Sequence, residues 1–389
     1  MDILDIKEQN LHLIINTVRF EDGITKKRLA HETGLSFATV SNLCNDLITQ
    51  NVLVTKKNEC LTVGRTPQNL YFNKNQFYTI CLNLQLRGVI RLAVLNFQNE
   101  VIFSNKYNVD EINSAEEVVK FAHKKYKEDF LAELDNQNFT VIGIGVAVSA
   151  IFDIQTGKIC NSAIDFFTDV PLKKIVEKEF GIPAYVDNEA NLCAISAEAM
   201  HPQTGELVYL HISEGVGVGI IVGHKILQGI NGYAGEVAHI PIGDNSVKCS
   251  SCGNYGCVEE ELSINGILKD TFGKSSANKM EQWNQLITLL ENGEKESLEL
   301  ARHKGILLGK LASVLINLFD PAVFIVGGDI AGIFKFCENS FYDELRKRCP
   351  VIVANKINII CDHDSENTLL FGLNQAICNR WLPIDVHSA

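Results

Sequence analysis

The sequence lacks the features that would place the chain in or across a membrane. No uninterrupted apolar segment reaches the ~18–20 residues that a membrane-spanning helix needs. The first residues, MDILDIKEQN, contain no basic region followed by an apolar run, so no secretory signal is expected there. We therefore expect a cytoplasmic protein that makes no contact with membranes.

A surplus of basic charge is also lacking. The 389 residues carry a formal net charge of −12, which argues against a chain coated with nucleic acid along its whole length. The charge is uneven, because residues 1–75 hold nine Lys and Arg against eight Asp and Glu. A near-neutral N-terminal part therefore precedes an acidic body, in a chain long enough for two or three domains.

Signs of disulfide bonding are absent, although the chain has 12 cysteines. Without an export signal, the thiols are expected to stay reduced. Cys81, Cys160, Cys193 and Cys378 stand among apolar residues, so we expect them to be buried as small hydrophobic side chains.

Residues 24–47, ITKKRLAHETGLSFATVSNLCNDL, predict two short helices separated by a turn at Gly34. Glycine suits a tight turn that needs positive φ, and Ser36 is a favourable N-cap for the second helix. A β-hairpin is predicted next, starting at Val52. Residues 1–75 therefore predict a winged helix-turn-helix, with a generic helical adaptor as the alternative. The apolar residues with the spacing of one buried face are Leu29, Ala30, Leu35, Val40, Leu43 and Leu47.

The second helix of such a motif would present its outer face to the major groove of DNA. The residues predicted to contact DNA from this helix are Ser36, Phe37, Thr39, Ser41, Asn42 and Asn45. The basic residues expected to contact phosphates are Lys26, Lys27, Lys56, Lys57 and Arg65. One such domain alone binds DNA weakly, so we expect a homodimer, or a dimer of dimers, on an inverted-repeat operator.

Apolar strands and amphipathic helices alternate after residue 75. Residues 78–96 predict two strands around a turn, and residues 207–224 repeat that layout. Helices are predicted near 114–134, 171–180 and 296–319. Two similar beginnings within an α/β pattern predict a duplicated fold with a cleft between its lobes.

Residues 248–260, KCSSCGNYGCVEE, gather three cysteines within nine positions. Together with an upstream histidine they form H-x9-C-x2-C-x4-C, made of His239, Cys249, Cys252 and Cys257. One imidazole and three thiolates suit a closed tetrahedral zinc site, which would be structural rather than catalytic. A redox pair and unligated thiols are the alternatives.

The chain resembles the ROK family of bacterial sugar kinases and sugar-responsive repressors over nearly its whole length. The resemblance rests on AGEVAH (234–239), the cysteine cluster followed by Glu259, IPAYVDNEANL (182–192) and PAVFIVGG (321–328). The N-terminal domain followed by VGRTP resembles the repressor branch, since the kinase branch generally lacks that domain. The resemblance implies an α/β protein, in which a winged helix-turn-helix precedes a two-lobed, duplicated ribonuclease H-like fold of the actin and sugar-kinase type. The implied domains are residues 1–75, a first lobe at 76–198 and a second lobe at 199–371, with a C-terminal helix at about 372–389 packing back on the first lobe.

The resemblance also implies a sugar site. Glu236, His239 and Glu259 would contact sugar hydroxyls, and the zinc ion would fix the loop that carries the last two. Asn188 and Glu189 would be further hydroxyl partners. Glu189 is a degenerate base position, because family kinases have Asp there. The chain also has one residue more between Cys249 and Cys252 than the usual family pattern.

The phosphate-binding parts of the family's kinases are degraded in this sequence. Their first hairpin carries Asp-x-Gly-Gly-Thr, whereas residues 83–87 here are NLQLR, with bulky residues in place of the glycines. The glycine-rich segment 213–220, SEGVGVGI, is assigned to a tight hairpin. The sequence therefore predicts a non-enzymatic, DNA-binding repressor of carbohydrate-utilisation genes, controlled by a monosaccharide or its derivative bound between the lobes. The alternatives are an ATP-dependent sugar kinase with a regulatory DNA-binding domain, and a repressor that answers to another protein.

Overall fold

The chain forms two compact units. The computed structural model describes residues 3–57, 68–85, 88–133, 139–153, 156–162, 164–243, 247–273, 278–350 and 356–382. Unit 1 comprises Met1–Val146, Leu172–Val186 and Leu373–Ala389, and unit 2 comprises Ala147–Pro171 and Asp187–Gly372.

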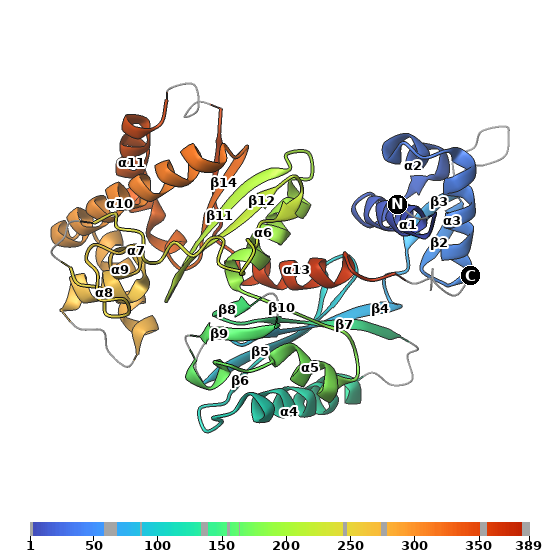
Figure 1. The fold of residues 1–389 in the computed structure, drawn as a ribbon, viewed down its shortest axis with the longest axis horizontal. Helices are drawn as coiled ribbons and strands as arrows, with labels where there is room; N and C mark the ends of the chain where they lie inside the picture. The colour runs from blue at the N-terminus through green and yellow to red at the C-terminus, as the bar shows by residue number, and fades with distance from the viewer. Residues whose placement is uncertain are drawn as a thin grey trace. The chain divides into compact units, whose positions relative to one another are not determined.

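Unit 1 begins with a head, residues 3–72, made of three helices and a small sheet (Figure 1). Its elements are α1 (Ile3–Phe20), β1 (Ile24–Thr25), α2 (Lys26–Thr33), α3 (Phe37–Thr49), β2 (Leu53–Lys57) and β3 (Gln68–Phe72), with strand order β1-β3-β2. Gly34 has φ +69° between α2 and α3, and the Ser36 hydroxyl accepts a hydrogen bond from the Thr39 amide at 3.1 Å. The two helices predicted around Gly34 are therefore confirmed. The tip of the hairpin, which includes Arg65, lies outside the described residues.

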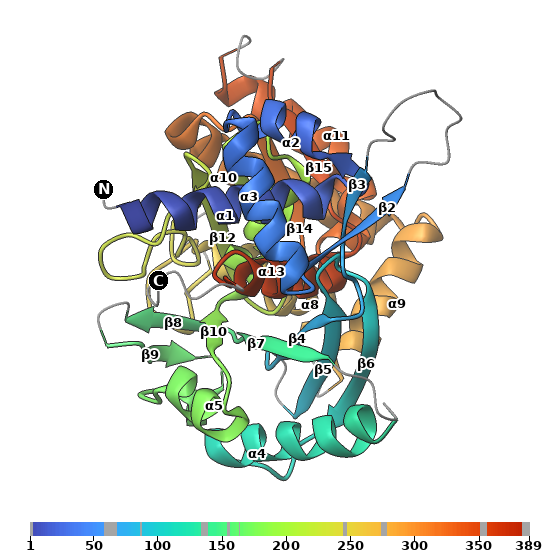
Figure 2. The ribbon, with the colours of Figure 1, turned by 90° about the vertical axis from the view of Figure 1, so that its right-hand side faces the viewer.

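The rest of unit 1 is built on a five-stranded sheet of order β10-β7-β4-β5-β6. Its strands are β4 (Phe77–Asn83), β5 (Val89–Asn96), β6 (Val101–Asn108), β7 (Thr140–Ala147) and β10 (Ala184–Asp187). Helices α4 (Ala115–Lys125) and α5 (Leu172–Phe180) cover one face in Figures 1 and 2, and the end of α13 (Ser365–Cys378) lies on the other. Glycine permits this approach, because a Cβ at Gly145 would lie 3.0 Å from the Leu373 side chain.

The helix predicted at 114–134 is shorter and less regular than expected. Helix α4 ends at Lys125, and a π-helical turn (Tyr126–Phe130) and a 3₁₀ turn (Leu131–Glu133) follow it. The wider turn coincides with two buried aromatic rings, those of Tyr126 and Phe130, whose centroids are 5.6 Å apart. Burial of this pair explains the irregularity.

Unit 2 repeats the strand order of unit 1. Its sheet has the order β13-β12-β11-β14-β15, so that in both units the first strand is central and the third and fifth are at the edges. The strands are β11 (Glu206–Ile212), β12 (Val216–Val222), β13 (Lys225–Ile226), β14 (Val323–Gly327) and β15 (Asn358–Cys361). The repeated order confirms the duplication predicted from the two similar hairpins.

Alternation along β11 divides its side chains between two faces of the sheet. Val208, Leu210 and Ile212 enter a core that also contains residues of the helices α7 to α11. These helices are α7 (Val258–Leu262), α8 (Ile264–Phe272), α9 (Lys279–Glu291), α10 (Lys295–Phe319) and α11 (Ala331–Arg348). Tyr209 is also buried, and its hydroxyl donates to Asp362 at 2.6 Å.

The units do not coincide with the expected lobes. Residues 147–171 and 187–198 group with unit 2. Residues 187–198 do so because α6 (Glu189–Met200) packs directly on β12. A Cβ at Gly219 would lie only 2.1 Å from the Ala190 carbonyl oxygen. The C-terminal helix α13 begins at Ser365, earlier than predicted.

The expectation that Cys160 is buried was wrong. This residue is exposed on β9 (Lys158–Ser162), which forms a two-stranded sheet with β8 (Ala150–Asp153).

Among the described residues, no helix is long and apolar enough to cross a membrane.

Candidate functional site

The four residues of the predicted metal cluster lie together in unit 2. One ligand atom from each of His239, Cys249, Cys252 and Cys257 lies within 4.8 Å of all the others. The Cys249 sulfur is 3.7 Å from His239 Nδ1, and the sulfurs of Cys252 and Cys257 are 3.6 Å apart. Cys249 therefore joins the cluster despite the additional residue before Cys252.

Backbone hydrogen bonds fold the cysteine loop back on itself. The Cys249 amide donates to the Asn254 carbonyl at 2.7 Å, and the Gly253 amide donates to the Cys249 carbonyl at 3.0 Å. Gly253 and Gly256 have φ values of +76° and +69°, which L-side chains rarely adopt. A hydrogen bond from the Asn254 backbone amide lowers the pKa of the Cys252 thiol, which favours the thiolate form that metals bind.

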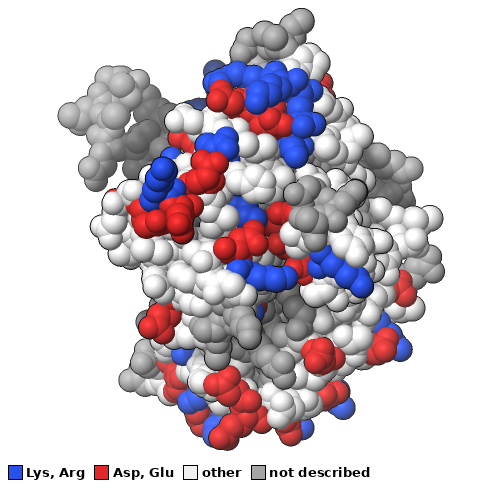
Figure 3. Space-filling view, turned by 90° about the vertical axis from the view of Figure 1, so that its left-hand side faces the viewer, with Lys and Arg blue, Asp and Glu red and all other residues white. Residues whose placement is uncertain are grey.

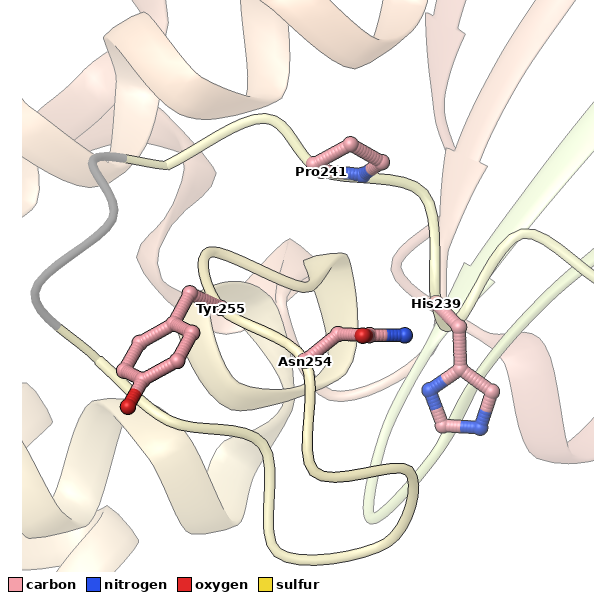
Figure 4. Close-up of a pocket in the computed structure, with 4 residues that line it drawn as sticks. All are labelled: His239, Pro241, Asn254 and Tyr255. Carbon is pink, nitrogen blue, oxygen red and sulfur yellow. The ribbon is translucent and has the colours of Figure 1, made fainter.

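A recess of about 540 Å³ opens beside this cluster, lined by His239, Pro241, Asn254 and Tyr255. Figure 4 shows the Asn254 side chain extending toward His239, while the Tyr255 ring points away from both. The histidine thus has one nitrogen near the sulfurs and an imidazole edge that borders open space. That arrangement leaves the histidine able to contact a ligand.

One glutamate lies near the histidine, and two others interact with it or with each other. Glu259 Oε2 is 3.9 Å from His239 Nδ1, and the carboxyl group of Glu236 interacts electrostatically with those of Glu189 and Glu259. Burial and these two charges raise the pKa of Glu236 to about 7, although solvent still reaches the residue. Burial likewise raises the pKa of Glu189, whose carboxylate accepts a hydrogen bond from the Ser149 hydroxyl.

A pH-dependent stability follows from Glu236. The folded chain binds this proton more tightly than an unfolded chain, so the stabilisation is complete at low pH and is lost as pH rises from 4.5 through about 7. Replacement by Gln removes the titrating group. We expect the Tm of Glu236→Gln to exceed that of the parent by about 2 °C near pH 8.5 and by less near pH 6, a small effect because solvent screens the charge.

Thermal unfolding in zinc-containing buffer measures this difference. Glu111→Gln, at an exposed position of unit 1, is the matched control. If the parent, Glu236→Gln and Glu111→Gln give parallel curves of Tm against pH, the pKa of Glu236 is not raised by burial and by its neighbouring carboxylates.

Asn188 has a structural role that sequence reasoning missed. It is the N-cap of α6, where its side-chain oxygen accepts a hydrogen bond from the Asn191 amide at 2.9 Å. Glu189 follows as the first residue of the helix. The predicted partners Glu189, Glu236, His239 and Glu259 therefore share one region of unit 2, with Asn188 fixing the end of the helix that carries Glu189.

Two other residues near this region were not predicted. The Ser149 hydroxyl donates a hydrogen bond to the Glu189 carboxylate. Tyr233 is exposed beside Glu236, and its hydroxyl is hydrogen-bonded to the Cys160 thiol. Tyr233 could have been predicted to lie near the site, because it stands only three residues before Glu236 in the sequence.

The predicted DNA-contacting residues of α3 are mostly on its outer surface. Phe37 is 58% exposed, Asn42 and Asn45 are exposed, and Thr39 and Ser41 are partly exposed. Two lysines have internal partners, since Lys26 Nζ donates to Asn45 Oδ1 at 2.6 Å and Lys56 Nζ lies 4.8 Å from the centre of the Tyr71 ring. Lys27 is exposed, and the backbone of Lys57 ends β2.

The turn of the first hairpin, which was expected not to bind phosphate, is internally hydrogen-bonded in its described part. Asn83 Oδ1 accepts the Gln85 amide hydrogen at 3.0 Å, and Leu84 is buried. Residues 86 and 87 lie outside the described part. Two glycines of the second hairpin serve packing on α6, since a Cβ at Gly217 would lie 3.3 Å from the Ala190 side chain and one at Gly219 would lie 2.1 Å from the Ala190 carbonyl oxygen.

Basic side chains on unit 2 are largely paired. In Figure 3, blue Lys and Arg groups adjoin red Asp and Glu groups. The ion pairs include Arg302 with Glu299 at 2.7 Å and Arg348 with Glu344 at 2.6 Å. Mixed charge of this kind forms a solvated surface rather than a continuous anion-binding face.

Comparisons with known proteins agree with the motifs. The chain is 25% identical to the xylose repressor of Bacillus spizizenii over 389 residues, which covers 99% of both chains. The crystal structure of a ROK family transcriptional regulator, a homolog of the Escherichia coli MLC protein, has a TM-score of 0.80 at 21% identity and covers 96% of this chain and 97% of its own. A ROK family glucokinase from Streptomyces griseus, solved with glucose and AMPPNP, has a TM-score of 0.62 at 20% identity and covers 77% of this chain and 98% of its own.

The family assignment follows from the extent of the match. The sequence model of the ROK family matches residues 89–363, which make up more than two thirds of the chain. This protein belongs to the ROK family.

Proposed function

We propose that this protein is a DNA-binding repressor of carbohydrate-utilisation genes, and that a monosaccharide or its derivative bound in unit 2 controls it. The observation that carries the proposal is the combination, in one chain, of a head exposing a polar helix face and an α/β body with a histidine–carboxylate cluster. The relatives named as repressors match the chain over nearly its full length, whereas the glucokinase leaves about the length of the head unmatched.

The arrangement of the head supports a winged helix-turn-helix. Helix α3 follows α2 across the Gly34 turn, and Phe37, Asn42 and Asn45 project from its outer surface. Short amide side chains suit direct contact with base edges in the major groove. The strands β2 and β3 form the wing, whose Lys56 would contact a phosphate.

The sugar site would consist of Glu189, Glu236, His239 and Glu259. Ionised carboxylates accept hydrogen bonds from hydroxyl groups, and several of them in one recess discriminate the positions of those hydroxyls. With Nδ1 of His239 directed at the sulfurs, Nε2 is the nitrogen that can contact a hydroxyl. D-Xylose is the first sugar to test, because a relative that matches 99% of this chain is named a xylose repressor.

The cysteine cluster fits a structural zinc ion. Two sulfurs at 2.3 Å from one tetrahedral ion would lie about 3.8 Å apart, close to the 3.6 Å between Cys252 and Cys257. His239, Cys249, Cys252 and Cys257 would hold the ion. The ion would fix the loop. It would thereby keep His239 near Glu259, because Glu259 lies only two residues after the ligand Cys257.

Retained kinase activity is the alternative, and the first hairpin argues against it. A phosphate would need free backbone amides, but the Gln85 amide is already bonded to Asn83. Glu189 stands where the family's kinases have Asp, and Ser149 holds its carboxylate. ADP release in the presence of a hexose panel would favour the kinase, and sugars that never alter thermal stability would favour a repressor answering to another protein.

The proposal is tested by measuring sugar binding and DNA binding on the same protein. We expect a homodimer whose affinity for an inverted-repeat operator changes when one sugar of the panel is added. Variants of the sugar site should no longer show this sugar-dependent change in operator affinity. That result would distinguish control by a bound sugar from control by another protein.

A further inference from the structure

The C-terminal helix α13 belongs to both units. Residues from Ser365 to Gly372 are part of unit 2, and residues from Leu373 to Cys378 are part of unit 1. A continuous helix is stiff along its axis, so a displacement at its start is carried to its end. The residues that each end of α13 contacts therefore determine whether a displacement in one unit reaches the other.

The start of α13 is fixed inside unit 2. The Ser365 hydroxyl accepts the Gly328 amide hydrogen at 2.7 Å, and Asp362, just before the helix, accepts the Tyr209 hydroxyl hydrogen at 2.6 Å. Gly372 lies against α6, because a Cβ there would be 2.0 Å from the Leu192 carbonyl oxygen. Helix α6 begins at Glu189, so α13 touches the helix that carries a proposed sugar ligand.

The end of α13 is fixed inside unit 1. Asn374 is fully buried, and its side chain accepts from the Thr79 hydroxyl at 2.7 Å and donates to the Asn96 carbonyl at 2.9 Å. The neighbouring Gln375 is 4% exposed, and its Oε1 accepts a hydrogen bond from Arg19 Nη1 at 2.5 Å. Arg19 lies on α1, so α13 ends on the head.

The hydrogen-bond acceptors of Arg19 in the described part of the chain are all neutral. Besides Gln375, its guanidinium donates to the Phe97 carbonyl and to Asn99 Oδ1, the latter at 3.1 Å. The residue is 4% exposed, and burial lowers its pKa. A buried charge is costly unless each donor is satisfied, and the planar guanidinium satisfies three acceptors in only one orientation.

The aromatic contact between the head and the segment after β5 is less selective. Phe72 stacks on Phe97 with ring centroids 4.3 Å apart. Apolar contacts of this kind have no fixed direction, so they tolerate a small rotation of the head. The hydrogen bonds of Arg19 have fixed directions, so they do not tolerate such a rotation.

We infer that Arg19 is the positioning residue through which α13 couples the sugar-binding unit to the angle of the DNA-binding head. The inference rests on the proposed function. Sugar contacts at Glu189 shift α6, and Gly372 transmits the shift to α13. The movement of Gln375 then weakens its bond to Arg19, so the head changes orientation and operator affinity changes.

The test compares DNA affinity with and without the effective sugar in four proteins. These are the parent, Arg19→Met, Gln375→Leu and, as a control, Arg302→Met, which removes an exposed arginine of α10. We expect the parent and the control to change DNA affinity by fivefold or more, and both coupling variants to change it by less than about twofold. Their sugar affinity should stay within about twofold of the parent, and a double variant should lose no more response than either single variant.

Unchanged sugar responses in Gln375→Leu and in folded Arg19→Met would overturn the inference. If Arg19→Met does not fold, Gln375→Leu decides alone. A parent that binds DNA but ignores every sugar would refute the proposed function instead. Hydrogen exchange then tests the coupling: Ser365→Ala, altered only in unit 2, must accelerate exchange of the amides of α1 near Arg19, and an unchanged rate contradicts the coupling.

Discussion

Replacing Glu259 with Gln is expected to abolish the response of DNA binding to sugar while leaving the DNA affinity of the sugar-free protein unchanged. The Glu and Gln side chains have nearly the same size. Glu259 belongs to unit 2, whereas the DNA-binding head belongs to unit 1. Hydrogen bonds to a charged acceptor contribute about 1.5–3 kcal/mol, so its loss should weaken sugar binding about 10- to 150-fold.

Glu236→Gln should give the same separation of effects. Its carboxyl group has a pKa near 7, so below neutral pH the parent already carries a partly neutral group, and the difference from Gln should grow with pH. Calorimetric titration with the effective sugar measures affinity, and fluorescence anisotropy of labelled operator measures the response. Glu299→Gln, at an exposed position of α10, is the control. Normal sugar responses in both variants would show that the pocket is assigned wrongly.

Loss of the metal is expected to have the second largest effect. Cys257 is fully buried in the cluster, so Cys257→Ser removes one ligand without a change in size. Unit 2 would then lose the stabilisation that a tightly bound ion provides, with a fall in Tm of about 5–10 °C. The sugar response should disappear as well, because the loop would no longer keep His239 beside Glu259.

Metal analysis and thermal unfolding test this prediction. Cys249→Ser should behave like Cys257→Ser, since both sulfurs lie in the cluster. Cys361→Ser, on β15, should keep one zinc ion per chain and a nearly unchanged response to sugar. A Cys257→Ser protein that retains full zinc and full sugar response would contradict the proposed role of the cluster.

Local signals made part of the structure predictable. The turn at Gly34 and the cap at Ser36 depend on residues next to them, and the cysteine cluster depends on spacing within one loop. The duplication was predictable because the two hairpins share one layout, an apolar strand, a turn and a second apolar strand. In each case the residues that determine the feature are close together in the chain.

Features that depend on distant residues were not predictable. The head is held by Arg19, whose acceptors Phe97 and Gln375 lie 78 and 356 positions further along. Residues 187–198 join unit 2 because α6 packs on β12, a contact that no local pattern indicates. Within the candidate site, the capping role of Asn188 was also missed, although its place before an apolar helix was a usable signal.

The most direct test of the central claim is selection from a random duplex DNA pool by the purified, zinc-loaded protein at moderate salt. The proposed repressor predicts enrichment of an inverted repeat, whose half-site spacing reports the geometry of the dimer, and a change in its retention when D-xylose or another sugar is added. A pool that shows no enrichment, from a protein with full zinc content, would contradict a head that reads DNA by itself and would favour the kinase or the partner-dependent regulator.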